Sequence, residues 1–245
     1  MIVLRIFAAL AAAALAACAG PTTSEINVTD RSTFIPSARV AVDITEQAGP
    51  HSAPHGSHAI ELGLSGGRGS DTQTLSAGER PVVFGSQTFN PTQQLRNEFD
   101  FRFVELAYRY RKFFGSSQAF GIEGLGGLAY ADLGLTVSGA TQRASERLGN
   151  GGIVLSGGAI WRFLPTTSLQ ARLALFGSGK TEGVTGASRF DVYFAQALGQ
   201  QVALRAGFAS WNLRSQRESD DSSTSTKSPI RVRFSGPALG LDVMF

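Results

Sequence analysis

The chain has 245 residues, is rich in Gly (29) and Phe (17), and carries 17% charged residues with a formal net charge of +3. This small charge, spread over scattered basic residues, argues against a nucleic-acid-binding protein. Past the amino terminus no apolar run reaches the roughly 18 residues of a membrane-spanning helix. The single cysteine, Cys18, excludes an internal disulfide framework.

Residues 1–17 have the features of a secretion signal peptide, because Arg5 precedes a short apolar stretch, Ile6 to Ala14. The following Leu15-Ala16-Ala17-Cys18 resembles the lipobox of bacterial lipoproteins. That resemblance implies cleavage before Cys18 and lipid attachment to its sulfur, with anchoring at the periplasmic side of the outer membrane. The alternative is an ordinary signal peptide that is cleaved nearby.

Residues 18–57 are rich in Thr, Ser, Pro, Gly and Ala, which is typical of a tether, here a periplasmic one. Within it, residues 39–44 alternate and predict a short strand, either accessory or packed under the main domain. His51, His55 and His58 suggest either a metal-binding tether or a solvated linker. We favour the linker, because a structural metal site needs a fixed ligand geometry, and we predict no metal and no cofactor.

From His58 onward, apolar and polar residues alternate with a period of two, as in strands that have two different environments. We expect eight strands, near residues 60–64, 98–113, 118–138, 152–164, 169–175, 189–197, 201–214 and 230–245. The apolar parity changes near Val104-Glu105, Ala131 and Gly236-Pro237. We interpret the first and last of these changes as β-bulges.

The expected connections alternate between a few residues and long polar loops, the long ones near residues 66–97, 139–150, 177–188 and 215–228. Outer-membrane barrels combine an even strand number with short periplasmic turns and long external loops. The predicted fold is therefore all-β, an eight-stranded antiparallel up-and-down transmembrane β-barrel over residues 58–245. We expect the last strand to pair with the strand near His58, with both barrel termini on the periplasmic side.

This pattern resembles the small outer-membrane barrels of the OmpA and OmpX kind, through its topology and its carboxyl-terminal phenylalanine. The resemblance implies that the barrel-assembly machinery recognises the final strand, at Leu241, Val243 and Phe245. No sequence motif specific to that family is present.

Bulky apolar residues occupy one face of nearly every strand, and they are too large for the interior of a closed eight-stranded barrel. We therefore expect them to face lipid. The opposite face would hold a salt-bridge plug in the lumen, in preference to a channel or catalytic cluster. The predicted lumen charges are Glu61, Asp100, Arg102, Glu123, Asp132, Arg162, Arg172, Asp191, Arg205, Arg231 and Arg233.

These features predict an outer-membrane lipoprotein with a structural or surface-interaction role. Its partners would be outer-membrane lipid, the assembly machinery and an unidentified surface ligand, and not nucleic acid. The first long loop carries Phe84 and Phe89 and is expected to fold partly as a contact surface. A lipid-modifying enzyme is one alternative, but no histidine follows the first strand to act as a base, so no enzyme is predicted. A soluble lipocalin-like binding barrel is the other alternative.

Overall fold

The structure is a computed structural model, and it describes residues 26–44, 56–76, 81–217 and 228–245. These residues form strands and no helix, so none of them belongs to a helix able to cross a membrane. The strands are β1 (Ile26–Asp30), β2 (Ile35–Asp43), β3 (Ser57–Thr74), β4 (Val82–Phe84), β5 (Gln87–Phe89), β6 (Gln94–Phe114), β7 (Phe120–Ser138), β8 (Arg143–Leu164), β9 (Thr167–Gly177), β10 (Gly183–Ala197), β11 (Val202–Arg217) and β12 (Ser228–Met244).

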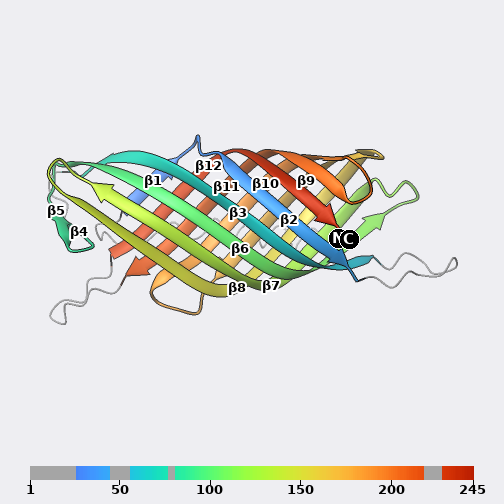
Figure 1. Cartoon of the computed structure of the whole chain (residues 1–245), viewed down its shortest axis with the longest axis horizontal. Coiled ribbons are helices and arrows are strands. Elements are labelled where there is room, and N and C mark those ends of the chain that lie inside the picture. The colour runs from blue at the N-terminus through green and yellow to red at the C-terminus, as the bar shows by residue number, and fades with distance from the viewer. Residues whose placement is uncertain (1–25, 45–55, 77–80, 218–227) are drawn as a thin grey trace, which may run out of the picture.

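Ten of these strands form one sheet that closes into a ring, in the order β1-β12-β11-β10-β9-β8-β7-β6-β3-β2, with β2 also paired to β12. Each strand from β3 to β12 in this ring pairs antiparallel with its chain neighbours, and the strands are tilted to the long axis of the molecule (Figure 1). The ring is closed by β1 and β2, which lie one after the other along the edge of β12 and run parallel to it.

The closure differs from the prediction that the last strand pairs with the strand near His58. β2 is inserted between them, with Val40 beside Val243 on β12 and beside Leu62 on β3. The predicted strands correspond to β3 and β6 to β12, but the sheet contains ten strands, and an eight-stranded ring is not confirmed. The described part of the predicted tether contributes β1 and β2 to the ring. On β2, the side chains of Arg39 and Ala41 face inward, whereas that of Val40 faces outward.

The parity changes in the sequence are not bulges. The register of β6 with β3 and β7 runs unbroken past Val104, and that of β12 with β11 runs unbroken past Gly236. The apolar residues instead change faces along a regular strand. On β6, Phe103 is buried in the interior whereas Leu106 is exposed on the outer face. Register shifts do occur elsewhere, at residues 184–186 of β10 and 162–164 of β8.

This change of faces divides the ring into two halves. One half has an interior filled with charged side chains and is called the charged half. It lies near the short turns at residues 115–119, 165–166 and 198–201. Its outer face is apolar, with exposed side chains that include Leu62, Leu106, Leu128, Leu155, Leu173, Phe190, Phe194, Leu204, Phe208 and Leu239.

The other half, near the β4–β5 hairpin and residues 139–142 and 178–182, is called the aromatic half. Its interior is apolar, and its outer face carries polar residues such as Arg68, Arg102, Asp132, Arg147, Arg214 and Arg233. The strands here extend further than the sequence predicted, so that residues 143–150, predicted to lie in a loop, belong to β8. The ends of the ring are called the turn end and the loop end.

The hairpin of β4 and β5 lies at the loop end (Figure 1). Its Phe84 and Phe89 are buried in the core with Leu95 and Val137, and the amide of Gln142 donates to the carbonyl of Thr88 at 2.6 Å. The first long loop is thus folded, as expected, but these two phenylalanines are covered and do not form a contact surface.

The two ends of the described chain approach the ring from opposite directions. Ile26 pairs with Ile230 near the loop end, whereas Phe245 lies at the turn end. There the N–H of Phe245 donates to the carbonyl of Ala41, and the N–H of Asp43 donates to the carbonyl of Phe245. The start of β3, near His58, and the end of β12 both lie at the turn end, as predicted, although β2 separates the two strands.

Candidate functional site

The interior of the charged half is centred on Glu61 of β3, which is fully buried. One carboxylate oxygen accepts a hydrogen bond from Arg109 of β6 at 2.7 Å, and the other accepts one from Arg172 of β9 at 2.8 Å. Arg39 of β2 adds an ion pair at 3.8 Å. Three guanidinium groups from three strands therefore surround a single carboxylate.

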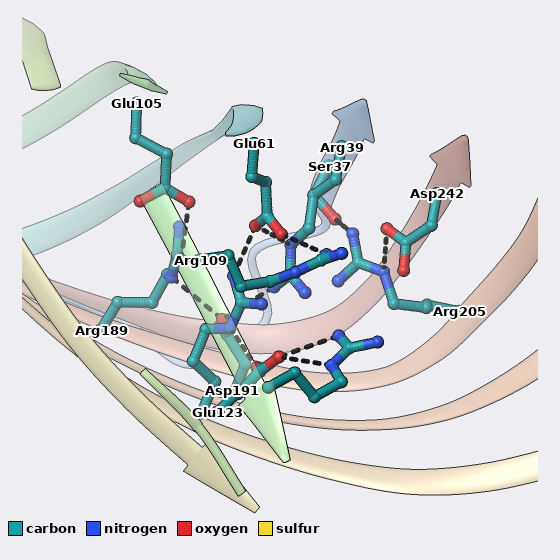
Figure 2. Close-up of polar contacts among 12 residues, drawn as sticks. Ser37, Arg39, Glu61, Glu105, Arg109, Glu123, Arg189, Asp191, Arg205 and Asp242 are labelled. Carbon is teal, nitrogen blue, oxygen red and sulfur yellow. Dashed lines mark hydrogen bonds and ion pairs between the residues drawn. The ribbon is translucent and has the colours of Figure 1, made fainter. Parts of the chain in front are cut away.

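The network continues to both sides of Glu61. Arg172 also binds Glu123 of β7 at 2.8 Å, and Glu123 accepts a second bond from Arg111 at 2.9 Å. Toward the aromatic half, Arg189 of β10 binds both Glu105 at 3.1 Å and Asp191 at 2.9 Å. Near β12, Arg205 binds Asp242 at 2.8 Å and Ser37 at 3.3 Å, as Figure 2 shows.

Interior glycines make room for these long side chains. A Cβ atom at Gly63 would lie 2.7 Å from the side chain of Glu105, and one at Gly240 would lie 2.7 Å from the guanidinium of Arg205. A Cβ at Gly158 would lie 3.0 Å from the carboxylate of Glu123. These three glycines are thus part of the site, since a larger residue at any of them would press on a charged side chain of the network.

The network connects opposite walls of the ring. Arg172 and Glu61 come from strands that are not neighbours in the sheet, and their contact crosses the interior. Buried ions need partners, because taking a charge out of water costs several kcal/mol even after relaxation. A set of paired ions that crosses the lumen is a rigid plug, and its members hold one another in place.

The structure brings together five of the predicted lumen charges, namely Glu61, Glu123, Arg172, Asp191 and Arg205, and all five are buried. It places Asp100, Arg102, Asp132, Arg231 and Arg233 on the outer face of the aromatic half. These five were assigned inward because the apolar face of each strand was taken to be the outer face along its whole length. Arg162 lies at the turn end, with its guanidinium over the ring of Phe113 at 3.6 Å.

The sequence reasoning missed six members of the network: Arg39, Glu105, Arg109, Arg111, Arg189 and Asp242. Four of them share a simple pattern. Glu105, Arg109 and Arg111 alternate with the outward Leu106, Tyr108 and Tyr110 on β6, and Arg39 alternates with Val40. A charged residue that alternates with apolar residues of the outer face indicates an interior position, and this pattern could have identified these four residues from the sequence.

The interior of the aromatic half is closed by a cluster of aromatic rings. Trp211 lies 4.8 Å from Phe101 and 5.1 Å from Phe103, between ring centroids, and Phe234 lies 5.0 Å from Phe99. The guanidinium of Arg189 lies 5.2 Å from the centre of the Trp211 ring, so the cluster and the charged network touch. Trp211 packs edge-on against Phe101 and Phe103 and stacks on Phe234, so the cluster combines both favourable ring arrangements.

Between β1 and β3 the ring is joined by side chains and not by a backbone ladder. Asp71 accepts a hydrogen bond from the N–H of Thr29 at 3.0 Å, and Asp30 accepts one from the N–H of Ser70 at 3.2 Å. Burial alone would raise the pKa of Asp30, but hydrogen bonds from Ser32 and Ser70 outweigh this effect and lower its pKa below the usual value. This junction, defined as the β1–β3 seam, lies in the aromatic half.

The remaining predicted sites have simple outcomes. Cys18, His51 and His55 lie outside the described residues. His58 contacts the rings of Tyr108 and Tyr110, and no cluster of metal-ligating side chains occurs in the described part of the chain. Of the predicted assembly signal, Leu241 and Val243 lie in the last residues of β12 and Phe245 follows the strand, with Leu241 and Phe245 exposed.

Comparison with protein-family models, with curated proteins and with solved structures finds no match to this chain.

Proposed function

We propose that this protein is a β-barrel of the bacterial outer membrane that is inserted through its charged half, while its aromatic half and loop end project into water. Its role would be structural or surface-interacting, with the lumen closed to solutes. The observation that carries the proposal is the continuous apolar outer face of the charged half, which surrounds an interior of paired ions.

The length of this apolar outer face suits a membrane. On β7 it runs from Phe120 to Tyr130, and on β8 from Ile153 to Phe163. About 11 residues at a tilt of about 45° rise roughly 26 Å, close to the ~25 Å apolar band of outer-membrane barrels. Beyond Tyr130 the outer face of β7 continues with Asp132, which marks where lipid would give way to water.

Aromatic side chains near the turn end support the same placement. Phe114 lies 6.4 Å from Phe120, and Phe163 lies 5.9 Å from Trp161 and 6.3 Å from Phe194, between ring centroids. All five are exposed on the outer face. Amphipathic and aromatic rings prefer the boundary between lipid and water, so this belt would lie at one interface of the bilayer.

The filled interior favours a structural role over transport. The ion network bridges the charged half, and the aromatic cluster closes the other half. A lipocalin-like protein would use an apolar interior for a ligand, and here the rings of Phe101, Phe103 and Trp211 occupy that space themselves. The surface left for interaction is the polar outer face of the aromatic half, which would stand clear of the membrane.

A pair of arginine substitutions on β11 tests the membrane placement. Ala206 and Gln216 both face outward, the first in the charged half and the second in the aromatic half. In lipid vesicles, Ala206→Arg should lower the free energy of unfolding in urea by about 2–4 kcal/mol, the cost of a cation near the bilayer midplane. Gln216→Arg should change it by about 0.5 kcal/mol or less.

Equal effects of the two substitutions would contradict the placement, as would recovery of the folded wild-type protein in water without detergent. Heat-modifiable migration in gels should accompany the folded, membrane-extracted protein. Mass analysis of the mature chain would separately establish whether Cys18 carries a lipid.

A further inference from the structure

A cavity of about 280 Å³ opens at the turn end of the ring, below the ion network. Its floor and sides come from the β8–β9 turn at residues 165–168 and from the ends of β10, β11 and β12. Four arginines reach it from three strands: Arg39 of β2, Arg109 and Arg111 of β6, and Arg162 of β8.

The charges around this cavity are unbalanced. Asp242 is the only carboxylate among the described residues that line it, and it already accepts a hydrogen bond from Arg205 at 2.8 Å. Glu61 and Glu123, which pair with Arg109 and Arg111, do not line the cavity. The lining of the cavity therefore has an excess of positive charge facing open space.

Arg109 has a buried N–H donor without an acceptor, and Arg162 has no carboxylate partner among the described residues. Arg109 is 7% exposed, and its Nε has no hydrogen-bond partner among the described residues, although its Nη1 binds Glu61. Arg162 is exposed at the mouth of the cavity and forms no ion pair with any described carboxylate, and its guanidinium carbon lies 3.6 Å from the centre of the Phe113 ring. A buried donor that lacks an acceptor costs about 1–3 kcal/mol, and neighbouring guanidinium groups repel one another.

An anion in the cavity would relieve both costs. The guanidinium group has planar, paired N–H donors that match the oxygens of a phosphate. Thr166, Thr167, Ser168 and Gln170 add hydroxyl and amide groups to the same lining, while Ile160 and Ala203 add apolar walls. The volume exceeds that of a phosphate ion and leaves space for a small polar group attached to it.

We propose that this cavity binds the phosphate of a small phosphomonoester or of a phospholipid headgroup, held by Arg109, Arg111 and Arg162. The inference rests on the cavity alone and does not require the membrane placement above. Its two sources of phosphate share one chemistry, and they can be separated by experiment.

The test uses the full-length protein folded in a nonionic detergent, with glycerol 3-phosphate and inorganic phosphate as probes in titration calorimetry. Saturable binding with one site is expected. Arg162→Gln should weaken it about tenfold or more, because it removes a charge-assisted contact. Arg214→Gln is the matched control, an exposed arginine in the aromatic half without an ion pair to described residues, and it should leave the affinity unchanged.

A second variant avoids changing any charge. Ala197 lines the cavity at the end of β10 and forms hydrogen bonds only through its backbone, whose N–H donates to the carbonyl of Thr166 at 2.8 Å and whose carbonyl accepts from the Gln196 side chain at 3.1 Å. Ala197→Phe should fill the space and abolish binding, which keeps the test valid if Arg162→Gln does not fold.

The source of the phosphate is decided in vesicles. Protein in phosphatidylcholine vesicles is compared with protein in vesicles that contain phosphatidylglycerol. If the headgroup is the ligand, phosphatidylglycerol should raise the unfolding midpoint of the wild type but not of Ala197→Phe; if a free phosphomonoester is the ligand, only glycerol 3-phosphate should do so. The proposal is wrong if neither probe nor lipid binds, or if Ala197→Phe binds as the wild type does.

Discussion

Replacing Glu61 by glutamine tests whether the ion network stabilises the fold. The substitution keeps the shape of the side chain and removes the single negative charge shared by Arg39, Arg109 and Arg172. Glu61 has no exposed surface, so water cannot take its place beside the three guanidinium groups. Removing one partner of a buried ion pair costs about 3–5 kcal/mol, because it leaves a buried charge uncompensated.

Glu98 provides a matched control on the outer face of the aromatic half. It also pairs with two arginines, Arg96 at 3.0 Å and Arg143 at 3.7 Å, but its side chain is 41% exposed. Exposed ion pairs contribute about 0–1 kcal/mol. Glu61→Gln should therefore destabilise the protein by about 3–5 kcal/mol, and Glu98→Gln by less than about 1 kcal/mol.

The free energies can be measured by urea unfolding in lipid vesicles, followed by tryptophan fluorescence, since Trp211 is buried inside the ring and Trp161 lies on its outer face. The reasoning would be refuted if the two glutamine variants lost the same free energy. It would also be refuted if Glu61→Gln were as stable as the wild type, because the interior would then have to be hydrated.

Three further outcomes follow from the fold. Trp211→Ala should cost about 3–5 kcal/mol by leaving a cavity in the aromatic cluster, and its near-ultraviolet circular dichroism should weaken; an unchanged unfolding midpoint would contradict the packing. Ionised Asp30 stabilises the β1–β3 seam fully above its ordinary pKa of 3.8, and this contribution is lost as the pH falls through its lower folded-state pKa. Asp30→Asn should thus be less stable than the wild type by about 1 kcal/mol or less near neutral pH, with the gap closing in acid; a gap that widened in acid would reverse the sign of the argument. In a background without Cys18, the pair Val40→Cys and Val243→Cys should form a disulfide on oxidation, because neighbouring strands lie about 4.8 Å apart. The pair Leu62→Cys and Val243→Cys should not, since β2 separates them; the opposite result would restore direct pairing of β3 with β12.

The sequence was sufficient to predict β3 and β6 to β12 and the antiparallel pairing of consecutive strands among them, because alternation is local. It indicated the interior positions of Glu61, Glu123 and Arg205, where each charge follows and precedes residues that face outward. It also indicated the strand at residues 39–44, although its place in the ring depends on partners far away in the chain.

The sequence misled where the two environments exchange. On β6 the apolar residues move from the interior at Phe103 to the outer face at Leu106 without any shift in the pairing register. A β-bulge and an exchange of the apolar and polar faces look the same in the sequence, because both shift the positions of the apolar residues by one. Only the pairing register separates them, and the register depends on the neighbouring strands.

The parallel first strands also determine where an acyl anchor can reach. Ile26 pairs with Ile230 near the loop end, and eight peptide units from Cys18 extend at most about 29 Å. The ring between Ile230 and Met244 rises roughly 33 Å at a tilt of about 45°, and an extended backbone crossing hydrocarbon would lose the hydrogen bonds of every peptide group. An acylated Cys18 would thus enter the leaflet on the same side of the bilayer as the hairpin. Lipid anchor and loops would share one side of the bilayer: if the anchor faces the periplasm, the loops face it too, and if the loops face outward, the acyl chains lie in the outer leaflet.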